Sequence, residues 1–144
     1  MSSTQWSERI GFVASLATLQ EYEKNHIHVH ITELGQFLSS QLKEIFSRHQ
    51  LNIDIGGIES VPMFHIHEEN PFLIKTLWTQ LLLKKGILAS SMIYLSYAHT
   101  REVIDSFLDA ANEVCHQIQH AKSLGTLESL LEGHMCHQGF ERLT

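Results

Sequence analysis

The 144-residue sequence has few of the features that mark secreted, membrane-spanning or nucleic-acid-binding proteins. Its two cysteines, Cys115 and Cys136, are too few for a disulfide framework. The opening residues lack the pattern of a signal peptide, so none is expected, and no apolar run approaches the roughly 18–20 residues that span a bilayer. Ten basic residues stand against sixteen acidic ones, which excludes a strongly basic surface for nucleic acid. We therefore expect a cytoplasmic protein with reduced thiols and with neither a membrane nor a nucleic-acid partner.

Catalytic signatures are also absent from the sequence. It contains no phosphate-binding P-loop, no GxSxG nucleophile turn and no GxGxxG dinucleotide fingerprint. Ser90, Ser91 and Cys115 have no predicted partner base, so nothing marks them as nucleophiles. From these patterns alone we assign no catalytic residue.

The sequence does contain enough apolar side chains for one packed core. Hydrophobic residues make up 43% of the chain, and no repeat, low-complexity stretch or linker divides it. We therefore expect a single domain over residues 1–144.

The spacing of apolar residues predicts an alternation of helices and strands. Helices are expected over residues 7–24, 28–49, 70–84 and 100–121, with a short one near 124–131. Strands are expected over residues 51–55, 61–67 and 87–91, while residues 92–97 fit either a strand or an extended loop. Gly56 and Gly57 are expected to end the first strand. This order predicts the α+β class, with a small, mostly antiparallel sheet covered by helices on one side.

Local signals mark two helix starts and three apolar faces. Asn70 followed by Pro71 is typical of a helix start, and Thr100 is expected to cap the last long helix. The expected apolar face of the first helix comprises Ile10, Phe12, Val13, Leu16, Ala17 and Leu19. That of the last helix comprises Val103, Phe107, Ala110, Ala111, Val114 and Ile118. On the second strand the expected inward residues are Val61, Met63 or Phe64, and Ile66.

Eleven histidines make a metal site worth testing. On a helix, His26 and His30 would be neighbours at i, i+4, and His65 alternates with His67 on the second expected strand. A histidine-rich metal binder would require His26, His30 and one of His65 or His67 to converge. Near the C-terminus His134, Cys136 and His137 fall short of a ligand set. Since no CxxC or HExxH signature is present, we expect surface histidines and assign no metal ligand.

Three stretches of the sequence carry a resemblance to a known family. Residues 87–114, ILASSMIYLSYAHTREVIDSFLDAANEV, resemble the C-terminal region of class III pyridoxal-phosphate-dependent aminotransferases, whose last helix opens with A-H-T-x-E/D-x-I-D. Residues 2–20, SSTQWSERIGFVASLATLQ, resemble the segment of that family in which a Ser/Thr-rich turn leads into a long helix. The closing GHMCHQGFERLT is similar to the end of some aminomutase relatives. The group most similar is that of glutamate-1-semialdehyde 2,1-aminomutase.

The resemblance implies a domain organisation and a cofactor. The chain would be the C-terminal small domain of a fold-type I pyridoxal 5'-phosphate enzyme, with residues 122–144 as a tail extension. The large cofactor-binding domain would lie upstream in a polypeptide about three times as long, and the whole enzyme would be a homodimer that moves an amino group between an amino acid or amine and a carbonyl. None of the six lysines matches the family's cofactor lysine, so the chain alone is not expected to catalyse the reaction.

The same resemblance implies one cofactor contact. Thr4 matches the family's threonine that reaches the phosphate of the partner subunit's cofactor, with Ser3 as a weaker candidate. A helix start suits a phosphate, but Thr4 fits a simple N-cap equally well. The family turn carries Gly, Asn and Pro where this chain has Ser7, Glu8 and Arg9, so the substrate need not be glutamate semialdehyde. We expect Arg9 to be a surface charge.

A second interpretation belongs to another class of function. The chain would be a free-standing interaction or dimerisation module derived from such an enzyme. An exposed apolar patch would mark its binding site, and it is expected within residues 51–58 or 92–97.

Overall fold

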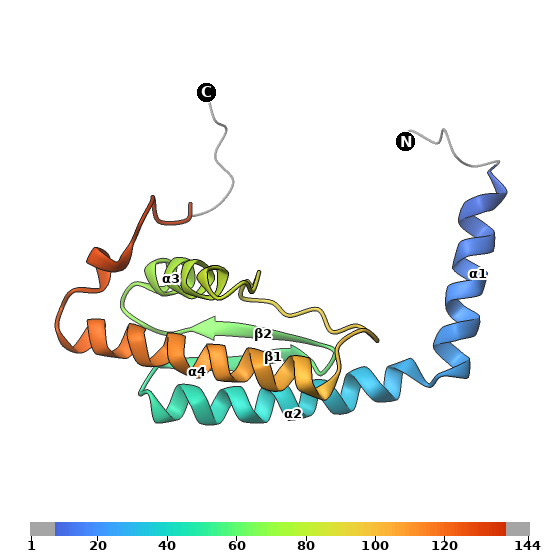
Figure 1. Ribbon diagram of the computed structural model, residues 1–144, viewed down its shortest axis with the longest axis horizontal. Coiled ribbons are helices and arrows are strands. Elements are labelled where there is room, and N and C mark those ends of the chain that lie inside the picture. Colours follow the sequence, from blue (N-terminus) through green and yellow to red (C-terminus); the bar gives the residue numbers. More distant parts are fainter. Residues whose placement is uncertain (1–7, 138–144) are drawn as a thin grey trace.

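The computed structural model describes residues 8–137 and confirms the α+β class (Figure 1). The elements in chain order are α1 (Arg9–Lys24), α2 (Ile27–Arg48), β1 (Ile53–Ile58), β2 (Val61–Ile66), α3 (Pro71–Lys84), α4 (Arg101–Ser123) and a 3₁₀ turn, η1 (Leu127–Leu130). In Figure 1 the hairpin of β1 and β2 lies among α2, α3 and α4, whereas α1 turns away from this body. Within the described residues, no helix is both long and apolar enough to cross a membrane.

Both expected helix starts are confirmed. The backbone N–H of Leu73 donates to Oδ1 of Asn70 at 3.1 Å, and Pro71 occupies the first turn of α3, where a missing N–H costs nothing. The backbone N–H of Val103 donates to the hydroxyl of Thr100 at 3.4 Å. Each side chain thereby satisfies one of the donors that a helix leaves free at its N-terminus.

The hairpin differs from the expected strand boundaries. β1 and β2 pair antiparallel from Ile53↔Ile66 to Ile58↔Val61. The expectation that Gly56 and Gly57 end the first strand is wrong, because both lie inside β1 and the chain turns at residues 59–60. Gly57 has a φ of +86°, and a Cβ there would lie 2.5 Å from the carbonyl oxygen of Val61. Close approach of two backbones therefore explains glycine at this position better than strand termination does.

The expected strand at residues 87–91 is wrong as well, since residues 87–95 form an irregular extended segment beside β2. Among residues 8–137, its pairing is limited to the isolated bridge Met63↔Met92 and three backbone hydrogen bonds. These join Phe64 N–H to Ser91 O, Ile93 N–H to Pro62 O, and Leu95 N–H to Ser60 O, at 2.8, 3.1 and 3.0 Å. Pro62 accepts a hydrogen bond from Ile93 but has no N–H with which to donate to the carbonyl of Ile93. This missing bond interrupts the ladder along this edge of β2.

One apolar core fills the space between the hairpin and helices α2, α3 and α4. Its fully buried members include Leu38, Leu42, Phe46, Leu77, Leu82, Val114 and Ile118. Trp78 packs edge-on against Phe46 and Phe64, with ring centroids 6.0 and 5.4 Å away. Removing each such large side chain from water stabilises the fold by roughly 1.5–3 kcal/mol.

Two expected inward faces are confirmed in part. On α4, Ala110, Ala111, Val114 and Ile118 are buried as expected, but Val103 is 49% exposed, and Ile104 and Leu108 are buried instead. On β2 Phe64, one of the two alternatives, is buried together with Pro62, and Ile66 packs against the core, whereas Val61 and Met63 are only partly covered. Side chains two residues apart on a strand share a face, so Pro62, Phe64 and Ile66 form the inward face of β2.

Glu68 forms hydrogen bonds with two residues that are distant from it in the sequence, Asn52 and Lys122. Its carboxylate accepts the backbone N–H of Asn52 at 2.8 Å and a hydrogen bond from Nζ of Lys122 at 2.6 Å. The side chain of Glu68 is only 8% exposed. Burial by itself would raise its pKa, but the hydrogen bonds from Lys122 and Asn52 together with the Lys122 charge hold the pKa below its ordinary value.

The segment after α4 folds back on α3. Gln80 donates from Nε2 to the carbonyl of Leu130 at 2.8 Å and accepts the backbone N–H of Glu132 at 3.0 Å. The backbone N–H of Cys136 donates to the hydroxyl of Thr76 at 3.0 Å. The short helix expected near residues 124–131 is a single 3₁₀ turn.

Candidate functional site

Ser3 and Thr4, the two expected cofactor contacts, lie outside the described residues. Arg9 is exposed at the first position of α1, as expected of a surface charge. Within the described residues, the candidate site consists of two uncovered apolar surfaces.

The first surface is helix α1. None of its sixteen residues is buried. Its large apolar side chains are 59 to 78% exposed, and they are Ile10, Phe12, Val13, Leu16 and Leu19. The expected apolar face therefore exists, but it does not pack against the core of this chain.

The apolar side chains of α1 form one wide face. With 3.6 residues per turn, this face runs from Leu19 through Phe12, Leu16 and Val13 to Ile10 and covers about half of the helix circumference. The other half carries polar or small residues such as Ser15, Thr18 and Glu21. An apolar stripe of this width normally packs against a protein core. The face of α1 therefore needs a cover that the described residues do not supply.

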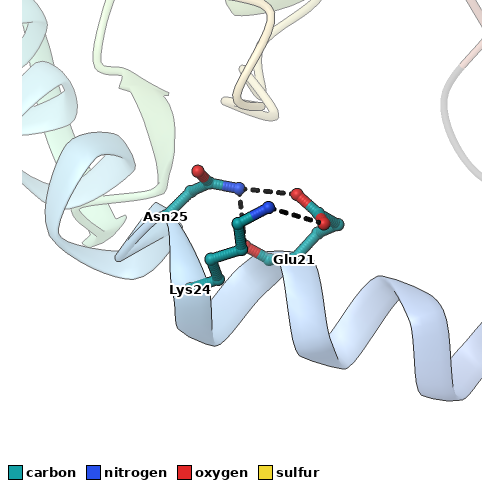
Figure 2. Close-up of polar contacts among 3 residues, drawn as sticks. All are labelled: Glu21, Lys24 and Asn25. Carbon is teal, nitrogen blue, oxygen red and sulfur yellow. Dashed lines mark hydrogen bonds and ion pairs between the residues drawn. The ribbon is translucent and has the colours of Figure 1, made fainter.

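The end of α1 is polar and well defined. Figure 2 shows the side chains of Lys24 and Asn25 both turned toward the carboxylate of Glu21. Asn25 also donates from its backbone N–H and its Nδ2 to the carbonyl of Glu21, each at 3.0 Å. His26 then takes a left-handed conformation with φ 49°, which separates α1 from α2. The direction of α1 is thus set by a capped helix end followed by a single residue of unfavourable backbone geometry.

The second surface is an open groove of about 890 Å³ between the extended segment after α3 and the first turns of α4. Its apolar lining includes Ile87, Leu88, Met92, Tyr94, Val103 and Phe107. Leu88 is 86% exposed and Tyr94 66% exposed. The groove overlaps residues 92–97, where an exposed apolar patch was expected. In residues 51–58 the expectation holds only at Ile58, because Leu51 and Ile53 are buried.

Polar contacts fix His99 at the edge of this groove. The backbone N–H of Ser96 donates to Nδ1 of His99 at 3.0 Å, so the neutral imidazole carries its proton on Nε2. Nε2 of His30 lies 2.9 Å from the carbonyl of His99 and must act there as the donor. The ring of His30 meets that of Tyr97 edge-on, with centroids 5.5 Å apart. These contacts join α2 to the segment before α4.

Glu102, which also lines the groove, lies in the first turn of α4. The hydroxyl of Thr100 and the backbone N–H of Glu102 itself lower the pKa of its carboxyl. The groove therefore has an anionic edge at neutral pH.

The lysines of this chain all lie at its surface or are only partly covered. A cofactor lysine has to be held in a desolvated pocket to be uncharged and reactive. None of the six lysines, all within the described residues, is buried. Four of them form ion pairs, which are Lys24–Glu21, Lys84–Glu132, Lys85–Glu113 and Lys122–Glu68. Burial raises the pKa of the Cys115 thiol to about 12, so it is not a ready nucleophile either.

The histidines do not converge as a histidine-rich metal binder would require. Across residues 8–137, no group of three or more His, Cys, Asp or Glu side chains is placed to hold a metal ion. His26 lies outside the helix, and His30 is engaged by His99. Nε2 of His67 lies 3.2 Å from Oδ2 of Asp54 on β1.

The sequence matches no family model, and no curated protein matches it. Solved structures do match its fold. The FumI protein of Sphingopyxis sp. MTA144, solved as the internal aldimine form with PLP, is 20% identical with a TM-score of 0.77, over 91% of this chain and 32% of its own. An omega-transaminase from Sphaerobacter thermophilus is 17% identical with a TM-score of 0.56, over 62% of this chain and 24% of its own. A transaminase with PLP bound is 19% identical with a TM-score of 0.56, over 65% and 24% of the two chains.

These likenesses concern the fold. The α+β arrangement of this chain is that of one segment of larger proteins, and it spans about a third or less of their length.

Proposed function

We propose that this chain is the small domain of a pyridoxal-phosphate-dependent aminotransferase or aminomutase, similar to class III enzymes of the glutamate-1-semialdehyde aminomutase group. The whole enzyme would be a cytoplasmic homodimer that transfers an amino group between an amino acid or amine and a carbonyl compound. The observation that carries the proposal is the fold match to FumI, which covers 91% of this chain but only 32% of that larger one.

The uncovered surfaces of the chain support this proposal. The wide apolar face of α1, from Leu19 to Ile10, is exposed in this chain. A large domain from the same polypeptide could cover this face and also the groove beside α4. Burying the five large α1 side chains would stabilise the assembled enzyme by roughly 1.5–3 kcal/mol each.

The exposure of the lysines fits an enzyme whose cofactor lysine lies outside this chain. Because no lysine here is buried, the proposal places the cofactor lysine in the part of the enzyme outside this chain. Pyridoxal phosphate would there act as the electron sink for amino-group chemistry. This chain would contribute packing that excludes water from the cleft. Thr4, with Ser3, would contact the phosphate of the partner subunit's cofactor.

The test is the natural gene product, purified from its source cells with an antibody against this chain. We expect a species of roughly three times 16.5 kDa that contains pyridoxal phosphate and transfers amino groups from a panel of amines to keto acids. As the matched control, the 144-residue chain alone should retain no cofactor after borohydride reduction and mass analysis. A natural species of 16.5 kDa without cofactor would refute the enzyme proposal.

The same uncovered surfaces also favour a second candidate, the free-standing interaction or dimerisation module. It predicts that the 16.5 kDa species is the natural product and that α1 is covered by another polypeptide in the cell. Intact mass therefore separates the two candidates before any activity is measured.

A further inference from the structure

A pair of histidines on α4 has the geometry that the sequence suggested for a different pair. His116 and His120 are separated by one helical turn, both lie well inside Arg101–Ser123, and both are exposed. Their rings are parallel to within 5°, with centroids 6.3 Å apart. Among the described residues, neither imidazole is engaged in a hydrogen bond or an ion pair. Side chains at i and i+4 of a helix lie on the same face, so both rings can turn toward one point.

The contrast with His26 and His30 shows why spacing alone is insufficient. They too are four residues apart, but His26 precedes α2 in a left-handed conformation and is not on its helical face. Nε2 of His30 is committed to the carbonyl of His99. His116 and His120 have neither restriction.

The charged and polar side chains next to His116 and His120 already have partners of their own. His49, on α2, lies next to His116 with ring centroids 6.0 Å apart, but its Nε2 is 2.9 Å from Oδ1 of Asn112. Arg48 donates to the same amide oxygen at 3.3 Å and is held there. Glu113 is paired with Lys85. His49 therefore has an orienting partner already, and we give it no coordinating role.

We propose that His116 and His120 chelate one divalent transition-metal ion such as Zn²⁺, with water in the remaining positions. Neutral imidazole nitrogen is a preferred ligand of this class of ion, and Zn–N distances are about 2.0–2.1 Å. The rings reach such an ion by rotating about their own side-chain bonds, which exposed residues do between staggered conformers. Two protein ligands make an open, exchangeable site, unlike the four-ligand sites that hold folds together.

Occupancy has a consequence for the fold. An ion that binds only the native helix stabilises the native state by RT ln(1 + c/Kd), where c is the ion concentration, so the stabilisation grows with the logarithm of c above Kd. Since α4 supplies eight buried residues to the core, the stabilisation should appear in the unfolding of the whole domain.

The experiment is calorimetric titration of the 144-residue chain, prepared without a polyhistidine tag, with ZnCl₂ in a buffer that does not bind zinc. We expect one ion per chain and a zinc-dependent rise in Tm. His116→Gln and His120→Gln should each weaken Kd at least tenfold and abolish the rise in Tm. A double control, His26→Gln/His28→Gln, removes two exposed histidines elsewhere and should leave Kd within twofold.

A second measurement counts the ligands directly. The electron paramagnetic resonance spectrum of the Cu²⁺-loaded chain should show two equatorial nitrogens, and one in His120→Gln. The proposal is overturned if His116→Gln and His120→Gln bind zinc as the parent does, or if the double control loses as much affinity as they do. A tenfold loss in His49→Gln would likewise overturn the two-ligand assignment. Circular dichroism confirms that each variant is folded.

Discussion

Gly35, in the middle of α2, offers the sharpest test of the packing between α2 and the hairpin. A Cβ on Gly35 would lie 1.8 Å from the carbonyl oxygen of Glu59 and 2.6 Å from its carbonyl carbon. It would also lie 3.1 Å from Cδ1 of Leu95. The first two are backbone atoms at the hairpin turn, so no side-chain rotation can relieve the overlap. Gly35→Ala would have to push the hairpin and α2 apart by more than 1 Å.

Two effects of opposite sign decide the result of Gly35→Ala. Alanine in a helix interior is favoured over glycine by about 1 kcal/mol. Overpacking by one methyl group costs about 1–3 kcal/mol, and a clash with backbone belongs at the upper end. We therefore expect a net loss of about 2 kcal/mol in the free energy of unfolding. For a chain of this size that loss corresponds to a Tm lower by about 4–8 °C.

The assay is urea unfolding followed by circular dichroism, with the m-value compared between variants. The matched control is Gly11→Ala in α1, where an added Cβ meets nothing within 4 Å. Gly11→Ala should leave the stability unchanged or slightly higher. If Gly35→Ala were as stable as the parent, α2 and the hairpin could not approach as closely as described.

Four further predictions concern the core, a helix cap, a buried carboxylate and the thiols. Leu77→Ala, at a fully buried residue, should lower the free energy of unfolding by about 2–5 kcal/mol, while Leu16→Ala on exposed α1 should change it by less than about 0.5 kcal/mol; both are read from urea unfolding. Asn70→Ala removes the cap of α3 and should cost about 0.5–2 kcal/mol, whereas the more conservative Asn70→Asp should retain most of the stability. Because the pKa of Glu68 is lower in the folded state, its contribution is complete above the unfolded pKa of about 4.3 and is lost as the pH falls through the folded value. The difference in unfolding free energy between the parent and Glu68→Gln should therefore be largest near neutral pH and shrink in acid, and a difference that grows in acid would contradict the assignment. Finally, a thiol reagent should modify the partly exposed Cys136 in the native protein, and should modify Cys115, whose pKa is raised to about 12 by burial, only after denaturation.

Much of the fold follows from local signals in the sequence. The four long helices, both helix starts and a small antiparallel sheet were predicted. The helix signals are the spacing of apolar residues, Asn70-Pro71 and Thr100, and each of them acts on residues a few positions away in the chain. The errors lie where a contact between distant segments decides the outcome. Gly56 and Gly57 look like a strand end, but the close approach of Val61 gives Gly57 a place inside β1. Residues 87–91 have the composition of a strand, but among the described residues only Ser91 of this stretch bonds to β2, by accepting the N–H of Phe64.

The surfaces that suggest a function depended on tertiary structure. The sequence shows that α1 is apolar, but only the arrangement in Figure 1 shows that the core of this chain leaves it uncovered. The groove requires residues after α3 to lie beside the start of α4, which local pattern does not encode. The His116–His120 pair has the same i, i+4 spacing in the sequence as His26–His30. Only backbone conformation and hydrogen bonding distinguish the two.

The sequence by itself therefore determined the class of fold, the position of its helices and the family resemblance, because these depend on neighbours in the chain. Tertiary structure decided which apolar faces are buried and which histidines form hydrogen bonds within the described residues. It also decided at which glycines a Cβ would overlap with backbone atoms. The physical reason is that burial, desolvation and steric overlap are properties of pairs of atoms brought together by the fold, and those pairs are separated by tens of residues in the chain.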